Sequence, residues 1–325
     1  MLYIENTRGG DVSVFDPAAK KLVRTIELPD HVQPDDLVGA KDGRTLYVNA
    51  TKHVDHVHSY ASEEYSKFFA VDTTTDEVKW TLDIKGQVGH LLISKDERYI
   101  YNALFDRWYV ARVDTEKRAV DYFPVNFLGG HGVRLSPDGQ RLYVGSCLMG
   151  ELNVFDLASM EIIKKLYFRD PVRPFALTTD EKTLFVQTSW MHGFHVVDLA
   201  QDRILRTIAL PELPPETFVM NYWPNTVDHG LEITPDGSKL FALATTGCYV
   251  AVYNLPQLDL IKTIRVGNEP SWITGDGVGD YYYVSSRRSG DVSIISVKDL
   301  AEIARVPVGH WPQRMWFKPG TTTRS

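Results

Sequence analysis

The sequence predicts an all-β fold in which the whole chain, residues 1–325, forms a single seven-bladed β-propeller domain. Three observations predict it. Short apolar and β-branched runs alternate with turn residues, and no stretch shows a long helical pattern. The runs recur with a period close to 42 residues. The unit at each end of the chain is incomplete, as expected if the two ends complete one blade together.

The clearest repeating unit spans residues 129–168 and reads as four short strands. We expect these strands at 133–135, 141–144, 152–155 and 162–168. The first turn is Ser136-Pro137-Asp138-Gly139, in which Pro presets φ, Asp hydrogen-bonds to its own backbone and Gly takes a positive φ. Four strands joined by tight turns are typical of one propeller blade.

An acidic or amide residue near the end of the third strand marks the repeat. This position recurs seven times, at Asp16, Asp72, Asp114, Asp156, Asp198, Asn254 and near Asp299. The two steps from 114 to 198 are 42 residues each, whereas the steps from 16 to 72 and from 198 to 254 are 56 residues. Two units therefore carry insertions.

The two chain ends supply complementary parts of one unit. The chain begins with a second strand at Leu2 to Glu5, and it ends with a first strand at Gln313 to Phe317 that no further strand follows. We therefore expect the C-terminal strand to pair with the N-terminal strands. Such closure removes the free sheet edges that promote aggregation.

The composition argues against several classes of partner. The net charge is −7 and no Lys/Arg run stands out, so no nucleic-acid partner is expected. No apolar run is long enough to span a bilayer, and the N-terminus does not read as a signal peptide, so a cytoplasmic location without a membrane partner is expected. The two cysteines, Cys147 and Cys248, fall in different blades and are expected not to bridge. Association of the chain with further copies of itself is left open.

The repeats resemble those of the YVTN-type seven-bladed β-propellers. The segments that carry the resemblance are SPDGQRLYV, TPDGSKLFA and KDGRTLYV, each followed by a third strand similar to VFDL. The resemblance points to the broad group around the amine dehydrogenase heavy chain, cytochrome d1 and lactonase propellers. It implies the fold over nearly the whole chain, and it implies little about the reaction, because propellers host many activities.

In a propeller the first strand of each blade lines the centre, so residues that start these strands converge on one mouth. The position seven residues before the turn aspartate of a unit starts its first strand. This position is Asp35, His131, Arg173, His229 and Glu269 in five units. In the other two units we take His90, which is beside the counted position, and Gln313, which is the equivalent position, so the ring has seven members. The simpler interpretation is a hydrated channel opening, in which water molecules form the hydrogen bonds of these polar side chains. Three histidines at equivalent positions favour a functional site instead.

Two kinds of chemistry suit this ring. His90, His131 and His229 could bind Fe, Cu or Zn, with Glu269 or Asp35 as a fourth ligand or as an orienting group. Such a first-row transition metal would serve an oxidoreductase or a lyase that acts on a small molecule. Alternatively the histidines act as acid and base in a metal-free lyase, cyclase or lactonase in which Arg173 holds an anionic group.

A third possibility is a non-catalytic propeller that binds a protein on this face. Loops on the same face add candidate substrate-binding residues, which are Trp108, Trp190, His192, Arg287 and His310. The insertion at 211–228 adds Tyr222 and Trp223, and its prolines predict a loop that covers the site. The insertion at 51–67 carries three further histidines and is expected to be a solvated loop.

Sequence motifs that are absent narrow the choice of enzyme. The chain has no GxSxG, GxGxxG, GxxxxGK[ST] or CxxCH motif. A serine hydrolase of the nucleophile-elbow type, a nucleotide enzyme and a c-type cytochrome are therefore disfavoured.

Overall fold

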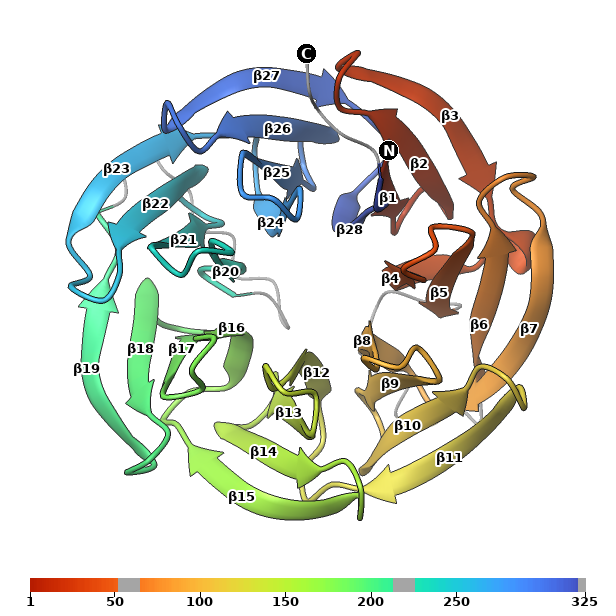
Figure 1. The fold of residues 1–325 in the computed structure, drawn as a ribbon, viewed down its shortest axis with the longest axis horizontal. Helices are drawn as coiled ribbons and strands as arrows, with labels where there is room; N and C mark the ends of the chain where they lie inside the picture. The colour runs from red at the N-terminus through yellow and green to blue at the C-terminus, as the bar shows by residue number, and fades with distance from the viewer. Residues whose placement is uncertain (52–64, 213–225, 321–325) are drawn as a thin grey trace.

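The computed structural model describes residues 1–51, 65–212 and 226–320. In these ranges seven four-stranded antiparallel sheets stand around a common axis like the blades of a propeller (Figure 1). The chain is thus an all-β, seven-bladed β-propeller, as predicted from its repeats. Apart from the short 3-10 helix η1 (Pro29–His31), the regular structure of this part of the chain is β-strand.

Each blade places its first strand at the axis and its fourth strand at the rim (Figure 1). The blades are, in order, β28 (Pro312–Phe317), β1 (Leu2–Asn6), β2 (Asp11–Asp16) and β3 (Lys21–Glu27); β4 (Gln33–Gly39), β5 (Thr45–Thr51), β6 (Tyr65–Asp72) and β7 (Val78–Lys85); β8 (Val88–Ile93), β9 (Tyr99–Leu104), β10 (Tyr109–Asp114) and β11 (Ala119–Pro124); β12 (Gly130–Leu135), β13 (Arg141–Ser146), β14 (Glu151–Asp156) and β15 (Glu161–Tyr167); β16 (Val172–Leu177), β17 (Thr183–Thr188), β18 (Gly193–Asp198) and β19 (Arg203–Ala209); β20 (Leu231–Ile233), β21 (Lys239–Ala244), β22 (Tyr249–Asn254) and β23 (Leu260–Arg265); and β24 (Pro270–Gly275), β25 (Tyr281–Ser286), β26 (Asp291–Ser296) and β27 (Ala301–Pro307).

The ring closes through the two ends of the chain. Strand β28 pairs antiparallel with β1, so that Leu2 lies opposite Phe317 and Tyr3 lies opposite Trp316. The first blade therefore takes its innermost strand from the C-terminal part of the chain and its other three from the N-terminal part. This confirms the closure predicted from the incomplete terminal units.

The recurring aspartates have a structural role in the turns. The Oδ1 atom of Asp156 accepts hydrogen bonds from the backbone amides of Ala158 and Ser159, at 3.1 and 2.8 Å, where the third strand turns into the fourth. In the turn after β12, the hydroxyl of Ser136 donates to Asp138, and this bond lowers the pKa of the Asp138 carboxyl. These side chains shape turns, as an Asx residue does.

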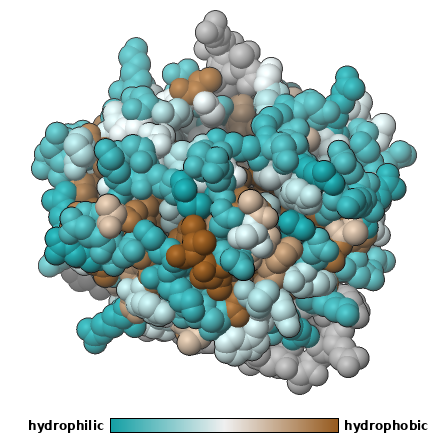
Figure 2. Space-filling model, turned by 60° about the horizontal axis from the view of Figure 1, so that its bottom comes forward, coloured by the Kyte–Doolittle hydropathy of each residue, from teal (hydrophilic) through white to brown (hydrophobic). Residues whose placement is uncertain are grey.

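Apolar side chains pack between neighbouring blades and form the core. In the blade of β12 to β15, the second and third strands are almost entirely buried, whereas most residues of the fourth strand, at the rim, are exposed or half-buried. The side of the molecule seen in Figure 2 is mostly hydrophilic, with a small group of hydrophobic side chains near its middle. Cys147 and Cys248 are both free. Among the residues described, no helix is long and apolar enough to cross a membrane.

A β-bulge interrupts six of the seven innermost strands at the same level. One extra residue lies on the innermost strand in each, within 34–36, 88–91, 130–133, 172–175, 270–272 and 312–315. A bulge breaks the strict alternation of side chains and redirects the residue that it contains. These bulges contain or border six of the seven residues that the sequence placed at the mouth, and the exception is His229, which precedes β20.

Buried polar side chains of the second strands hold the backbone near the axis. The carboxamide of Asn49 accepts the amide of Asp36 at 2.8 Å and donates to the carbonyl of Gly89 in the next blade at 2.7 Å. Gln187 likewise accepts the amide of Gly230 in the next blade at 2.7 Å. Because buried backbone groups need partners, these contacts fix the innermost strands relative to one another.

Candidate active site at the mouth of the ring

Three histidines from three blades meet at the axis. His90 lies on β8, His131 on β12, and His229 directly before Gly230 and β20. One nitrogen from each ring can be chosen so that all three lie within 4.8 Å of one another. The ring centroids are 3.8 Å apart for His90 and His131, 5.5 Å for His131 and His229, and 6.0 Å for His90 and His229.

His229 is fixed in one tautomer. Its Nδ1 atom lies 2.7 Å from the carbonyl oxygen of Ser271, so Nδ1 carries the proton and donates it, and Nε2 keeps its lone pair. Burial, followed by the positive charges of Arg173 and Arg287, lowers the pKa of His229 to about 3. The imidazole is therefore neutral near pH 7.

His90 is a buried histidine with an unused nitrogen. Its side chain is 6% exposed, and its Nδ1 atom has no hydrogen-bond partner in the part of the chain that the structure describes. A buried polar atom without a partner costs free energy, on the order of 1–3 kcal/mol. His131, which packs against the His90 ring, is half-buried.

Two arginines, Arg173 buried and Arg287 partly buried, lie close to the histidines. Arg173, in the bulge of β16, donates from Nε to the hydroxyl of Ser189 at 2.7 Å. Arg287 follows β25, and its side chain is 12% exposed. Burial lowers the pKa of both guanidinium groups, and each group lowers the pKa of His229. They give this side of the site a positive potential that suits an anionic ligand.

Of the two carboxylates predicted at the mouth, Glu269 is already paired. Its oxygens lie 3.1 Å from Arg287 and 3.2 Å from Arg288, and its backbone has a φ of 58° just before β24. Asp35 is half-buried on β4, and burial, then the charge of Asp36, raises its pKa to about 7. Among the described residues, the group of potential metal ligands consists of the three histidines and includes neither carboxylate.

Gln313, the remaining member of the predicted ring, links the two ends of the chain. Its carboxamide donates to the hydroxyl of Thr7 at 2.6 Å and accepts from the hydroxyl of Ser271 at 3.3 Å. Since Ser271 also holds His229 through its carbonyl, the closing strand contacts the same strand, β24, that orients His229.

Six of the seven predicted substrate-binding residues fall into three groups. Trp108 and Trp190 lie in loops between second and third strands with half of their surface exposed, 50% and 49%, and His310 is exposed as well. Arg287 lies beside His229, as described above. Tyr222 and Trp223, and most of the insertions at 51–67 and 211–228, lie outside the described residues.

His192 makes contacts with protein groups through both ring nitrogens. Nδ1 lies 3.1 Å from the buried carboxylate of Asp228, while Nε2 lies 2.9 Å from the carbonyl of Pro211 and 3.0 Å from the hydroxyl of Tyr249. Because Asp228 directly precedes His229 in the sequence, the contacts of His192 support the backbone that carries His229.

Sequence reasoning missed four residues near the predicted ring, which are Asp36, Trp272 and Arg314 on innermost strands and Glu5 on the neighbouring strand β1. Glu5 is fully buried, and burial followed by the charge of Asp35 raises its pKa well above the usual range. The Trp272 ring lies 5.8 Å from His90 and 6.1 Å from His229, between centroids.

The missed signal is adjacency to a predicted residue. Asp36 follows Asp35 and Arg314 follows Gln313. In a regular strand, neighbours point to opposite faces, so strict alternation assigns the second residue of each pair to the face that points away from the site. The bulges place both near the axis.

These observations define the class as a seven-bladed β-propeller with a buried cluster of three histidines at its mouth. No family model matches the chain. The chain is 22% identical over 328 residues to a 6-phosphogluconolactonase of Enterobacter sp. (strain 638), covering 91% of this chain and 90% of that protein. A 6-phosphogluconolactonase of Cronobacter sakazakii (strain ATCC BAA-894) is 22% identical over 326 residues, with the same coverage.

A solved structure shows the same fold. Hydrazine synthase of Kuenenia stuttgartiensis matches with a TM-score of 0.68 at 19% identity, covering 88% of this chain and 90% of the matched chain. The two relatives fit the lactonase-like propeller group and the solved structure shares the propeller fold, which confirms the resemblance predicted from the repeats.

Proposed function

We propose that the chain is an enzyme that acts on an anionic small molecule at the mouth of the ring, where His90, His131 and His229 hold one first-row transition metal ion. The observation that carries the proposal is the placement of three imidazole nitrogens within 4.8 Å of one another. Zinc, iron and copper are commonly held by sets of neutral histidines.

The three histidines fit such a metal in three further respects. His229 is held neutral, with Nδ1 bound to the Ser271 carbonyl, which is the outer contact that usually orients a metal-binding histidine. The partnerless nitrogen of His90 is also explained if that ring turns a nitrogen toward an ion. Three protein ligands leave a coordination position for water or substrate, as in catalytic zinc sites.

The relatives favour hydrolysis of a lactone over the oxidoreductase and lyase reactions that the same centre would also suit. A bound metal would supply Lewis-acid polarisation of the ester carbonyl and a more acidic water. Arg173 and Arg287 would bind an anionic group of the substrate. The Asp35 carboxyl, with a pKa of about 7, would exchange a proton near neutral pH.

A second candidate is a metal-free lactonase in which histidines transfer protons and Arg173 binds the anion. The names of the relatives favour it equally. The low pKa of His229 argues against His229 as the base, since an efficient general base has a pKa near the working pH.

One experiment separates the candidates. The untagged protein is purified without chelator, its metal content is measured by plasma mass spectrometry, and hydrolysis of 6-phosphogluconolactone and of uncharged gluconolactone is followed before and after chelation. We expect about one metal ion per chain, loss of activity on chelation, and a preference for the phosphorylated lactone. Activity that persists in metal-free protein would support the second candidate, and absence of hydrolysis would refute the lactonase reaction.

A further inference from the structure

A separate cavity of about 450 Å³ lies farther along the axis, beyond the bulges. It is lined by the C-terminal halves of the innermost strands and by the turns that follow them, whereas the histidines lie at the N-terminal halves. Its walls are mainly aliphatic, from residues such as Leu37, Leu91, Val133, Leu135, Ile273 and Met315. The size is typical of a small-molecule pocket.

The first charged group in this cavity is Arg314. Its side chain is 9% exposed, and its guanidinium lies 3.1 Å from the centroid of the Trp272 ring. The nearest carboxylate is Asp36, at 3.7 Å from Nε, which is beyond hydrogen-bond distance. Asp36 already accepts the backbone amides of Leu37 and Leu91, at 2.7 and 3.0 Å.

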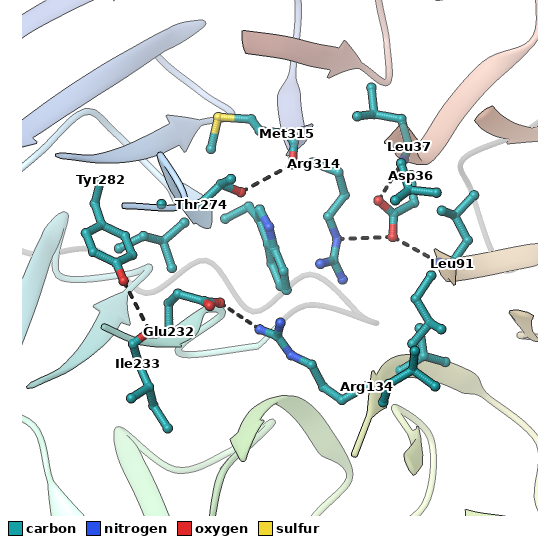
Figure 3. A pocket seen from close by; sticks show the side chains of 18 of the residues that line it. Asp36, Leu37, Leu91, Arg134, Glu232, Ile233, Thr274, Tyr282, Arg314 and Met315 are labelled. Atoms are coloured by element: carbon teal, nitrogen blue, oxygen red, sulfur yellow. Dashed lines mark hydrogen bonds and ion pairs between the residues drawn. The ribbon is translucent and has the colours of Figure 1, made fainter. Parts of the chain in front are cut away.

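The guanidinium of Arg314 therefore has an ion-pair contact with Asp36 and unused hydrogen-bond donors. It makes no hydrogen bond to a residue that the structure describes, although a guanidinium carries five N–H donors. Burial lowers its pKa to about 10, and the nearby carboxylates only partly offset this effect. In Figure 3 it extends into the cavity from the side of β28.

A second arginine reaches into the cavity from the opposite side (Figure 3). Arg134 of β12 is held by the carbonyl of Phe175 at 3.1 Å and by the carboxylate of Glu232 at 2.8 Å. Its guanidinium carbon lies 5.9 Å from the Trp272 centroid. Two guanidinium groups thus flank one indole.

We propose that this cavity is a second binding site, which takes a small monocarboxylate with an apolar body. The carboxylate would lie between the guanidinium groups of Arg314 and Arg134, which are suited to two-point binding of a planar anion. The aliphatic walls would bury the rest of the molecule, at roughly 25 cal/mol for each Å² of apolar surface removed from water.

The second site is distinct from the histidine cluster. The two sites are neighbours that share one side chain, Trp272. The His90 and His229 rings lie near its indole, and the guanidinium of Arg314 stacks on the same indole. The proposal stands on Arg314, Arg134 and the cavity, so it does not depend on metal binding or on lactone hydrolysis.

The test is isothermal titration calorimetry of the full chain with 4-phenylbutyrate, using 4-phenylbutyramide as a neutral ligand of the same shape. We expect the carboxylate to bind with a Kd below about 1 mM, and the amide to bind at least about tenfold more weakly. Arg314→Gln and Arg134→Gln should each weaken carboxylate binding at least about tenfold. Arg112→Gln, which removes an arginine paired with Asp121 outside the cavity, should bind like the wild type.

Several outcomes would overturn the proposal. These are equal binding of acid and amide, no binding at about 10 mM, wild-type affinity in both cavity variants, or inorganic phosphate binding as tightly as the probe. If Arg314→Gln fails to fold, Arg134→Gln decides, since the Arg134 side chain is 31% exposed. His131→Ala should retain carboxylate binding, and loss there would assign the probe to the histidine site instead.

Discussion

Tyr3 and Trp316 lie opposite each other in adjacent antiparallel strands, with ring centroids 5.4 Å apart and planes inclined by 44°. One belongs to the first strand of the chain and the other to the last, so this aromatic pair lies at the closure of the ring. The indole of Trp316 also packs on Gly39 of the next blade, where a Cβ atom would collide with it. The closing strand therefore joins two blades.

Removal of the closing strand should prevent normal folding. A chain that ends at Gly309 lacks β28 and leaves β1 and the neighbouring blades without their partner at the axis. We expect little soluble protein, because two sheet edges and several buried side chains become exposed. A chain that ends at Gly320 keeps β28 and should express and melt like the full protein. Equal melting temperatures of the two truncated chains would contradict closure by this strand.

Gly39→Ala should destabilise the fold by about 2 kcal/mol, because overpacking of a filled core typically costs 1–3 kcal/mol. The added methyl group meets the Trp316 indole directly. Trp316→Leu creates space at the same point, so the double variant should lose less stability than the two single losses combined. Urea unfolding of all four proteins measures this coupling. Strict additivity would show that the methyl group is accommodated elsewhere.

The repeat made the fold predictable from the sequence, because each unit carries the same local turn chemistry. Asp156 and Asp198 bond to the amides two and three residues later, whatever the tertiary context. The positions of His90, His131 and His229 followed from counting within that repeat. Their proximity is therefore a consequence of equivalent positions in a ring.

The remainder of the site depends on geometry that a pattern of residues does not encode. A bulge adds one residue to a strand and leaves no mark in the pattern of polar and apolar residues. The alternation of side chains along a strand therefore does not place Asp36 and Arg314 at the axis. The ion pair of Glu269 with Arg287 depends on side-chain packing between a loop and a strand end. Contacts of His192 likewise join segments from different blades.

His131→Ala should lose most of the bound metal while keeping the fold. The residue is half-buried near the axis, so its removal should change the melting temperature by only a few degrees. His195→Ala is the matched control, since His195 lies on β18 with its Nδ1 near the hydroxyl of Thr207. Metal content by mass spectrometry should fall in the first variant and stay at the wild-type level in the second. Unchanged metal in both would exclude the histidine cluster as the ligand set.

The Asp35 carboxyl should make stability fall as the pH rises. Its pKa is about 7 in the folded chain, against an ordinary value of 3.8, so between these values the folded state holds a proton that the unfolded chain releases. The free energy of unfolding therefore decreases from about pH 4 to about pH 7.

Asp35→Asn should remove the part of this pH dependence that comes from Asp35, whereas Glu5 and Asp36, whose pKa values are also raised by burial, are unchanged. The variant should match the wild type near pH 4 and exceed it at pH 8 by about 2 kcal/mol, since one pKa unit corresponds to about 1.4 kcal/mol and solvent screening reduces the full effect. Urea unfolding at both pH values measures the difference, with Asp202→Asn at an exposed turn as the control. Parallel pH profiles for the wild type and Asp35→Asn would show that this carboxyl does not titrate as described.

His192 and Asp228 form a buried pair that should matter for stability and for the position of His229. The Asp228 side chain is fully buried, and it accepts hydrogen bonds from His192 and from the amide of Gly193 at 2.8 Å. Burial alone would lower the pKa of His192, but the hydrogen bond and the charge of Asp228 raise it overall. His192→Ala leaves a buried carboxylate without its main side-chain partner.

We expect His192→Ala to lose about 3 kcal/mol of stability, since breaking a buried ion pair from one side typically costs 3–5 kcal/mol. The double variant His192→Ala with Asp228→Asn removes the unpaired charge, so it should be more stable than His192→Ala alone. Metal affinity should fall in His192→Ala, because Asp228 is adjacent to His229 in the backbone. Thermal melting and metal titration report the two effects separately. An unchanged melting temperature together with a raised KM would instead assign His192 to substrate binding.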